Sequence, residues 1–540
     1  MLREAVRYLQ GAAGDYYRRA AGIRRMVKAL PSTDPVSRIR QQLLQREIVF
    51  LDTVLRVVFE RADNPYFHMF RMAGCNFEDL EEIVMREGLE AALTVLHRAG
   101  VYLTHDEFKG KTAVVRNGRE IPACIQSFAN PFTKGVISGT SSGSRSRGTR
   151  TVQSAEVNVY REGYELLQRR EFGFSRRAQI QLKPLLPSTA GLTACLRAAR
   201  RGWRVDKWFA PDVSFGKEGV QWLSTSFATA VARTAGAAMP FPSMLPGNDF
   251  TPVARWIAES KKRGRDTFVS AMTGYAVRVA DAALQGGYDI SGAIFVAGGE
   301  AVSPAKRALV EAAGAEIYPM YWIHEIGPIG FACRQMNTGN CVHLFEDSVA
   351  VISHRRKAPL TEVEVDSLLF TTLLPQAPLV LINAEMEDAG ILGRANCGCV
   401  FGETGFHRQI ADVYSFGKLT AMGITLIGTD IITLLERDLP ARFGGCPGDF
   451  QLVEREVHAQ TEIILRISPR VGVSSAEVVK EYFLRELPNC NSGWVASRIL
   501  RHTGSFRTVV GEPLPTLTGK ILPLHVLGVS GRTGLPACQS

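Results

Sequence analysis

Apolar and polar positions along the chain follow two periods, which predict helices at the start and a mixed α/β core after them. Between Leu43 and Phe59 the apolar residues recur at helical spacing, and residues 77–84 repeat this pattern. From residue 155 to residue 300, helix-like and strand-like stretches alternate. Because this alternation favours a parallel sheet covered by helices, we expect an α/β fold.

The clearest local unit covers residues 292–321. The apolar strand 292–297 runs into Gly298-Gly299, and Ser303-Pro304 has the residue types of a helix N-cap and first turn. The apolar stretch 317–321 is the next strand. We therefore expect a βαβ-like unit with a glycine turn after its first strand, at the edge where α/β proteins bind ligands.

Shorter patterns predict the other elements. Beyond Phe406 the elements become shorter and mixed, which indicates a boundary near 412–417. Two of the predicted strands, 368–373 and 379–382, are expected to form a pair. The remaining predictions are strands at 101–104, 179–182 and 463–467 and helices at 253–262, 274–283 and 476–487.

The segment 138–151 carries the first candidate chemistry, because glycines, hydroxyl side chains and arginines crowd into it. Glycine lets the backbone approach a ligand closely, and successive backbone N–H groups bind anions. Hydroxyl and guanidinium groups add donors that suit phosphate oxygens. The segment therefore predicts a phosphate-binding loop, with a flexible Ser/Gly linker as the alternative.

Charge and composition narrow the ligand class. The net charge of +10 over 540 residues suits an anionic ligand such as a nucleotide, CoA or an acidic carrier protein. We expect no nucleic-acid partner, because there is no long Lys/Arg block or nucleic-acid motif. The chain has no apolar run long enough for a membrane span and no apolar signal core at its start, so a cytoplasmic protein is expected. Ten cysteines are too sparse for a disulfide scaffold.

Four stretches follow the loop in a recognisable order. They are Gly298-Gly299-Glu300-Ala301, the segment 321–328 that reads Tyr-Trp-Ile-His-Glu-Ile-Gly-Pro, Asp388 within 383–390, and the Thr-Leu-Thr-Gly-Lys run that ends at Lys520. In this order and at these distances, over about 135–525, they resemble the adenylate-forming superfamily of acyl-CoA synthetases and peptide-synthetase adenylation domains. Glu325-Ile326-Gly327-Pro328 followed by Cys333, together with 343–347, 370–373 and the Cys-Gly-Cys at 397–399, looks like the phenylacetate–CoA ligase branch.

The resemblance implies a reaction and a domain plan. The reaction is ATP-dependent activation of a carboxylic acid to an acyl or aryl adenylate with release of pyrophosphate, followed by transfer to a thiol, with CoA as the expected co-substrate. The fold would be a large N-terminal adenylating domain of β-sheets and packed helices, with a small mobile α+β domain after it. We expect residues 1–130 as the helical part of the large domain, 131–412 as its nucleotide- and acid-binding core, 413–417 as the hinge and 418–540 as the small domain carrying Lys520.

The resemblance also implies a role for each matching residue. Lys520 would reach the substrate carboxylate and the α-phosphate, Glu325 would hold Mg²⁺ and His324 would hydrogen-bond phosphate. The acid pocket is expected around Trp322, Ala297 and Tyr275. The residues expected to bind ATP are Ser141, Ser142, Gly143, Ser144, Arg145, Arg147, Gly148, Thr149, Gly298, Gly299, Glu300, Tyr321 and Asp388.

This chain departs from the family pattern at several positions. Its loop is longer and lacks the usual lysine, so Arg145, Arg147 or Arg150 is expected to substitute. Trp322 stands where the family has glycine, which should shorten the acid pocket. Only Asp388 survives of the family's ribose motif. The hinge at 413–417 has neither the usual arginine nor the usual acidic pair.

A second candidate centre consists of Cys333, His343, Cys397 and Cys399. Three thiols and one imidazole favour tetrahedral Zn²⁺ in a structural role, and the phenylacetate–CoA ligase branch has Cys and His at similar places. Cys341, two residues before His343, competes for a place in the set. Buried reduced cysteines are the alternative.

Two other functions stay open. The acyl acceptor could be the phosphopantetheine arm of an acyl or aryl carrier protein, or an amine, in place of CoA. A different class is a degenerate, non-catalytic nucleotide-binding or scaffold protein, which the altered hinge and the altered Asp388 motif favour. The intact Lys520 motif argues against that class.

Overall fold

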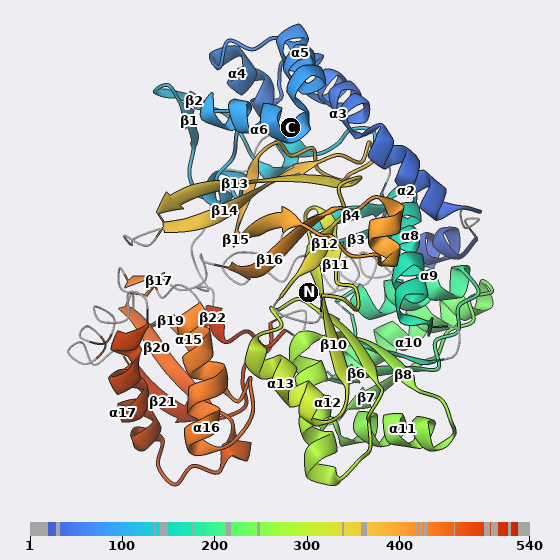
Figure 1. The fold of residues 1–540 in the computed structure, drawn as a ribbon, viewed down its shortest axis with the longest axis vertical. Helices are drawn as coiled ribbons and strands as arrows, with labels where there is room; N and C mark the ends of the chain where they lie inside the picture. Colours follow the sequence, from blue (N-terminus) through green and yellow to red (C-terminus); the bar gives the residue numbers. More distant parts are fainter. Residues whose placement is uncertain are drawn as a thin grey trace, which may run out of the picture.

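Figure 1 shows the computed structural model of the chain, in which a large body of sheets and helices lies beside a smaller one. No helix in the described part combines the length and the apolar character needed to cross a membrane. The structure describes residues 20–28, 33–133, 135–140, 150–174, 177–186, 188–211, 218–245, 249–336, 340–357, 364–415, 420–421, 424–425, 429–457, 460–490, 497, 500, 506–516 and 520–526.

A 12-stranded sheet in the order β13-β14-β15-β16-β12-β11-β10-β9-β8-β5-β6-β7 organises the large body. The predicted α/β fold is confirmed. The parallel part of the sheet consists of β5 (Ala178–Leu182), β6 (Lys207–Pro211), β7 (Pro242–Leu245), β8 (Thr267–Met272), β9 (Ile294–Gly298) and β10 (Glu316–Ile323). The antiparallel part adds β11 (Gly327–Phe331), β12 (Val342–Leu344), β13 (Val349–Lys357), β14 (Glu364–Thr372), β15 (Ala384–Arg394) and β16 (Arg408–Ser415).

Helices alternate with the parallel strands, as the sequence predicts. All five positions of β9 are buried, as expected of a parallel strand covered on both faces. The predicted βαβ unit is present: β9 and β10 run parallel with Gly298 opposite Met320, and the Ser303 side chain caps the helix between them. The helices of this part are α8 (Ala155–Phe172), α9 (Ala190–Arg200), α10 (Glu218–Thr234), α11 (Thr251–Lys262), α12 (Thr273–Gly286) and α13 (Pro304–Ala312).

Two predicted strands are wrong. Residues 379–382 form no strand along β14, because β13 and β15 already pair with both edges of that strand. The segment makes isolated hydrogen bonds instead: the Val380 N–H donates to the Phe128 carbonyl, and at the end of β14 Leu381 exchanges hydrogen bonds with Thr372. Residues 101–104 form a single bridge from Leu103 to Ala384 in place of a strand.

The N-terminal helices form a cap on the antiparallel part of the sheet (Figure 1). Their apolar faces share one core with β13, β14 and β15, in which Phe70, Leu93 and Leu369 are buried. The elements of this cap are α3 (Arg46–Val54), η1 (Leu55–Phe59), α4 (Pro65–Met72), α5 (Phe77–Glu87), α6 (Leu89–Arg98), α7 (His105–Phe108), β1 (Val114–Arg116), β2 (Arg119–Ile121) and η2 (Ile125–Phe128). Before them, α2 (Pro35–Leu44) packs on α8, and its Val36 and Ile39 share a core with Tyr164.

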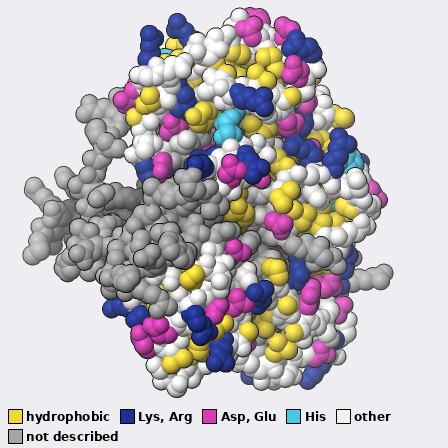
Figure 2. All heavy atoms as spheres, turned by 60° about the vertical axis from the view of Figure 1, so that its left-hand side comes forward, with side chains coloured by type: hydrophobic (Ala, Val, Ile, Leu, Met, Phe, Trp, Pro, Cys, Tyr) yellow, Lys and Arg dark blue, Asp and Glu magenta, His cyan; other side chains and the backbone are white. Residues whose placement is uncertain are grey.

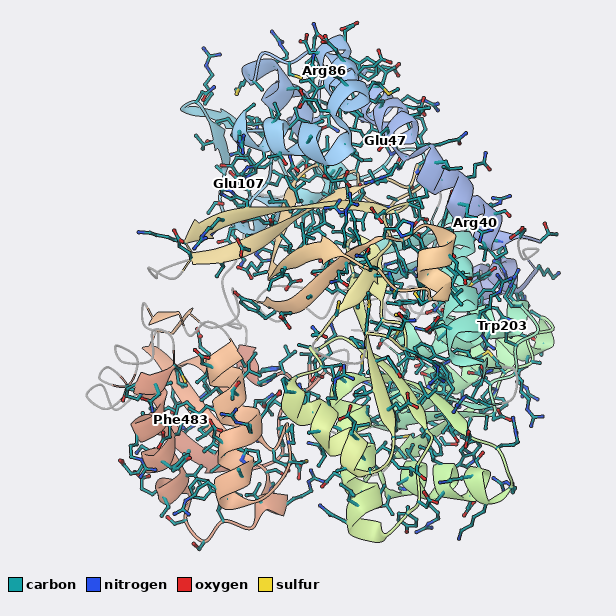
Figure 3. All side chains as sticks on the ribbon, in the orientation of Figure 1. Arg40, Glu47, Arg86, Glu107, Trp203 and Phe483 are labelled. Atoms are coloured by element: carbon teal, nitrogen blue, oxygen red, sulfur yellow. The ribbon has the colours of Figure 1, made fainter. Side chains whose placement is uncertain are left out.

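The smaller body has a four-stranded sheet, β21-β20-β19-β22, and a core of its own around Phe450, Leu465 and Phe483. Figure 3 shows Phe483 inside this body. Its elements are α15 (Thr429–Thr433), η5 (Leu434–Asp438), α16 (Leu439–Phe443), β19 (Phe450–Val457), β20 (Gln460–Ile467), η6 (Pro469–Val471), α17 (Ala476–Glu486), η7 (Leu487–Asn489), β21 (Phe506–Val510) and β22 (Leu524–Val526). The described residues also include four short strands and one helix: β3 (Gly135–Thr140), β4 (Arg150–Ser154), α14 (Val400–Thr404), β17 (Thr420–Ala421) and β18 (Ile424–Thr425).

Charged side chains of both signs are interspersed over the described part of the face in Figure 2. The net charge of +10 therefore does not gather into one basic patch on that part of the surface.

Candidate active site

A cavity of about 300 Å³ lies where the large and small bodies meet. This size falls at the lower end of small-molecule sites. The segments that line it come from the ends of β9 and β10, from β15 and β16, and from the small body at residues 520–524. Eight of the residues singled out from the sequence line it: Gly299, Glu300, Tyr321, Trp322, His324, Glu325, Asp388 and Lys520.

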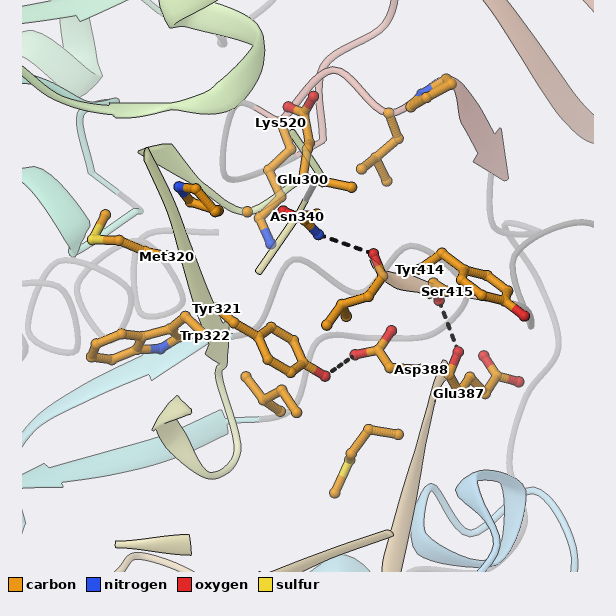
Figure 4. A pocket seen from close by; sticks show the side chains of 18 of the residues that line it. Glu300, Met320, Tyr321, Trp322, Asn340, Glu387, Asp388, Tyr414, Ser415 and Lys520 are labelled. Atoms are coloured by element: carbon orange, nitrogen blue, oxygen red, sulfur yellow. Dashed lines mark hydrogen bonds between the residues drawn. The ribbon is translucent and has the colours of Figure 1, made fainter. Parts of the chain in front are cut away.

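Tyr321 and Asp388 meet in this cavity. The Tyr321 hydroxyl donates a hydrogen bond of 2.7 Å to Asp388 Oδ2 (Figure 4). Burial and the adjacent carboxylate raise the pKa of Tyr321 well above its ordinary value, so the hydroxyl stays a donor. Glu387, directly before Asp388, has a φ of 59° in the left-handed region, and the pairing of β15 with β16 shifts register just after it. This irregular strand sets Asp388 beside the ring, although the surrounding family motif is lost.

Lys520 reaches the cavity from the small body, and two hydrogen bonds to Thr516 hold its backbone. Its backbone N–H donates to the Thr516 hydroxyl at 3.0 Å, and the Thr516 N–H donates to the Lys520 carbonyl at 2.8 Å. The next residue, Ile521, donates its N–H to Glu300 Oε1 at 3.1 Å. Gly299 has a φ of 89°, and a Cβ there would lie 2.9 Å from Lys520 Cε. The glycine turn is therefore needed for the close approach of the lysine.

A buried ionic cluster joins the two bodies next to Lys520. Lys306 Nζ lies 2.7 Å from Glu436 Oε1 and 3.4 Å from Glu300 Oε2, and the Ser303 hydroxyl donates to Glu436. All three charged side chains are at most 4% exposed. Lys306 belongs to the large body and Glu436 to the small one, so this cluster fixes how the bodies meet. Neither Lys306 nor Glu436 lies in a motif identified from the sequence.

Glu325 has a partner that the sequence analysis missed. Lys109 Nζ lies 2.6 Å from Glu325 Oε1, and both side chains line the cavity. Burial is the largest single influence and raises the pKa of Glu325, but the charge and hydrogen bond of Lys109, together with His324 and a backbone hydrogen bond, bring the pKa below its ordinary value. The carboxylate is thus ionised at neutral pH, as a magnesium ligand must be.

Three of the predicted ligand residues within the described part of the chain do not line the cavity. Ala297 is fully buried in β9, and Tyr275 is buried in α12, where its ring packs on Phe250. Gly298 is the last residue of β9, directly before the cavity-lining Gly299. The loop residues Ser141, Ser142, Gly143, Ser144, Arg145, Arg147, Gly148 and Thr149 lie outside the described residues. The strands that flank them are paired, with Thr140 opposite Arg150.

The predicted Cys₃His set comes together away from this cavity. His343 Nε2 lies 3.2 Å from Cys397 Sγ and 3.1 Å from Cys399 Sγ, while Cys333 Sγ lies 3.8 Å from Cys397 Sγ. The other ring nitrogen of His343 lies 3.0 Å from the Phe406 carbonyl, so Nδ1 carries the proton and Nε2 faces the thiols. Cys341 instead hydrogen-bonds Gln409 and stands apart from the set. Three thiols and one oriented imidazole suit Zn²⁺.

The comparisons give structural likeness without sequence relatives. No family model and no curated protein matches the sequence. One similar solved structure is McyG A-PCP complexed with phenylalanyl-adenylate, at 10% identity and a TM-score of 0.43, covering 82% of this chain and 72% of that one. Another is acetoacetyl-CoA synthetase from Streptomyces lividans, at 14% identity and a TM-score of 0.40, covering 75% of this chain and 55% of that one.

A third similar structure comes from work on fatty acyl-adenylate ligases of E. coli and L. pneumophila, at 12% identity and a TM-score of 0.35, covering 72% of this chain and 68% of that one. The three names refer to a phenylalanyl-adenylate complex, an acetoacetyl-CoA synthetase and fatty acyl-adenylate ligases. The phenylacetate–CoA ligase branch stays a prediction.

Proposed function

We propose that this protein is an ATP-dependent, AMP-forming ligase that activates a carboxylic acid. The acid would become an acyl or aryl adenylate, pyrophosphate would leave, and the acyl group would pass to a thiol, with CoA as the favoured acceptor. One observation carries the proposal: Glu300, Tyr321, Glu325, Asp388 and Lys520, which are far apart in the sequence, line a single cavity.

The chain's own residues supply the groups that such a reaction needs. An oxygen of the substrate carboxylate attacks the α-phosphorus of ATP, and the bond from this phosphorus to the pyrophosphate oxygen breaks. Because two anions meet, a cation must neutralise the transferring group. Lys520 has the reach and the charge for this role. The Tyr321 ring would lie against the base, and the Asp388 carboxylate, which has acceptor sites beyond the one that Tyr321 uses, would accept the ribose hydroxyls.

Glu325 is the residue that would hold Mg²⁺. Magnesium is commonly held by one or two carboxylates together with substrate phosphates, so the ionised Glu325 carboxylate is sufficient on the protein side. The ion would neutralise charge on the phosphates when bound with the nucleotide. His324, the preceding residue, also lines the cavity and would donate to a phosphate oxygen.

The side of the cavity at Trp322 favours a planar or compact acid. The guanidinium carbon of Arg161 lies 4.2 Å from the centre of the Trp322 ring, which holds the indole in place. The panel of acids to be tested should therefore include phenylacetate and other aryl acids beside aliphatic ones.

The test of the proposed function is acid-dependent ATP–pyrophosphate exchange. The wild type should exchange with at least one acid, and Lys520→Ala should lower exchange by at least about 100-fold, as loss of a charge placed at the reacting phosphoryl group does. Lys480→Ala is the matched control, because Lys480 lies on α17 of the same body and pairs with Glu477 at 2.8 Å, away from the cavity.

Two results would contradict the proposal. Full exchange in Lys520→Ala would remove this lysine from the mechanism. ATP binding without pyrophosphate release for any acid would favour a non-catalytic nucleotide-binding protein. The acceptor is identified by offering the adenylate separately to CoA, to a phosphopantetheine-bearing carrier protein and to an amine, and finding which one takes the acyl group.

We also propose that Cys333, His343, Cys397 and Cys399 bind a structural zinc ion. The support is the mutual approach of their ligand atoms, all within 4.8 Å of one another, and the hydrogen bond that orients His343. Four protein ligands leave no open position on the ion, so its role would be to hold the surrounding strands together.

A further inference from the structure

The short helix α7 brings two basic side chains to the cavity from the region that carries no family motif. Lys109, directly after α7, pairs with Glu325, and His105, at its start, lies 3.4 Å from Glu387 Oε1. Both basic residues line the cavity. The Lys109 and Glu325 side chains are only 13% and 8% exposed, so the pair is shielded from bulk solvent.

Buried contacts with the neighbouring residues fix the position of α7. Thr104 and Glu107 form a capping box at the start of the helix. Arg116 donates two hydrogen bonds of 2.7 and 3.0 Å to Glu107, and Figure 3 shows Glu107 in the N-terminal cap, on the side toward the large sheet. Leu103 bridges to Ala384 on β15, the strand that carries Asp388. Lys109 is therefore held on the same scaffold as the nucleotide-facing carboxylate.

The balance of charges in the cavity lining indicates a role for Lys109. Among the described residues, the cavity is lined by three lysines and by five residues with carboxylates: Glu300, Glu325, Glu387, Asp388 and Glu436. Lys306 lies between Glu300 and Glu436. A polyphosphate that entered such a lining would meet an excess of negative charge, so the cations at Lys109 and Lys520 are needed to hold it.

We propose that Lys109 is a polyphosphate-binding residue whose ammonium leaves Glu325 for phosphate oxygens when the nucleotide binds. The inference rests on the proposed function and extends it to a residue outside the family motifs. The exchange keeps every charge paired: Glu325 takes the divalent cation that accompanies the nucleotide, and Lys109 takes the phosphate. Lys109 thereby supplies the lysine that the loop at 141–149 lacks.

The experiment measures binding of ATP and of inorganic tripolyphosphate to the full-length protein by calorimetry, with and without Mg²⁺. Lys109→Met should weaken both ligands about 10-fold or more, as loss of a charge-assisted hydrogen bond does. Lys111→Met is the matched control, because Lys111 pairs with the exposed Asp106 at 3.0 Å and does not line the cavity. It should bind both ligands as the wild type does.

A double-variant cycle separates phosphate binding from neutralisation of Glu325. In Mg²⁺-free buffer, Lys109→Met should weaken binding both in the wild type and in Glu325→Gln. A loss seen only when Glu325 is present would overturn the inference, because Lys109 would then serve only to neutralise that carboxylate. Unchanged binding in Lys109→Met would overturn it as well.

The two proposals fail in different ways. If ATP binding depends on Lys109 but no acid gives exchange, the role of Lys109 in binding polyphosphate is supported and the ligase function is refuted. If the Lys109→Met variant binds ATP and exchanges pyrophosphate as the wild type does, the ligase function is supported and the polyphosphate-binding role of Lys109 is refuted. Absence of any ATP or tripolyphosphate binding to the wild type refutes both.

Discussion

At the scale of single residues, Asp347 shows how burial alone changes an ionisable group. Its side chain is fully buried and accepts a hydrogen bond of 2.7 Å from the Tyr164 hydroxyl, while Oδ1 has no hydrogen-bond partner among the described residues. Burial raises the pKa of Asp347 to about 7, although the Tyr164 hydrogen bond acts to lower it. The carboxyl is therefore protonated in mildly acidic solution, where an unfolded chain would have it ionised.

The sign of the resulting pH dependence follows from the raised pKa. Between the ordinary value of 3.8 and about 7 the folded state binds the extra proton, so the stability from this group is present at low pH and is lost as the pH rises to about 7. Asp347→Asn keeps the acceptor for Tyr164 and cannot ionise. Relative to the wild type, its free energy of unfolding should rise by about 2 kcal/mol between pH 5 and pH 8.

Chemical denaturation at the two pH values checks this expectation. Asp63→Asn, at an exposed aspartate, is the control and should show no such change. A constant difference between Asp347→Asn and the wild type across this pH range would contradict a raised pKa.

At the scale of elements, the Cys₃His set ties three segments of the large body together. Cys333 follows β11, His343 lies in β12, and Cys397 and Cys399 precede α14. The strands β11 and β12 approach closely: a Cβ on Gly330 would collide with the His343 carbonyl oxygen. β11 pairs with β12 on one side and with β10, which carries Tyr321, on the other. The Cys₃His set is therefore connected to the cavity through paired strands.

We expect about one zinc ion per chain after purification in metal-free buffer. Cys399→Ser should lose the ion and unfold at a lower temperature, because structural zinc contributes directly to folding. Cys341→Ser is the matched control, since Cys341 lies two residues from His343 but outside the set, and it should keep the metal. Elemental analysis of the wild type below about 0.2 equivalents would refute the site, because structural sites are filled on folding.

At the scale of the whole molecule, the two bodies meet through charges as well as through Lys520. Beside the cluster of Lys306 and Glu436, Arg470 of the small body pairs with Asp281 of α12 at 2.8 Å. Removing one partner of a buried ion pair leaves the other charge buried without compensation, which costs about 3–5 kcal/mol. The small body can avoid that cost by moving away and hydrating Glu436.

Lys306→Met should therefore separate the bodies without unfolding either of them. We expect a larger radius of gyration in X-ray scattering and a loss of ATP–pyrophosphate exchange of at least about 10-fold, because Lys520 leaves the cavity. Arg437→Met is the control: Arg437 adjoins Glu436 in sequence but is largely exposed and pairs with Asp438. An unchanged radius together with wild-type exchange would show that the cluster does not hold the bodies together.

Local patterns predicted the local structure well, and they failed where the rest of the fold decides. The unit at 292–321 was predictable because its apolar strands, glycine turn and N-cap act over a few residues. Helical spacing likewise predicted α2 and α3, but Leu44 and Ile48 in that pattern are 84% and 60% exposed. The pattern fixes the helix, whereas the neighbours fix which face is buried. Residues 379–382 have a strand's composition, but β13 and β15 already pair with both edges of β14, the strand predicted to pair with them.

The candidate site divides in the same way. The sequence led to Glu300, Tyr321, Glu325, Asp388 and Lys520 because the order of their motifs resembles the adenylate-forming superfamily. It led to the Cys₃His set because three thiols and one imidazole suit zinc, at places similar to those in the phenylacetate–CoA ligase branch. Only the tertiary structure revealed the pairing of Lys109 with Glu325 and of Lys306 with Glu436. The first pair is separated by 216 positions. A single lysine has no sequence signal of its own, because its function depends on the carboxylate that folding places beside it.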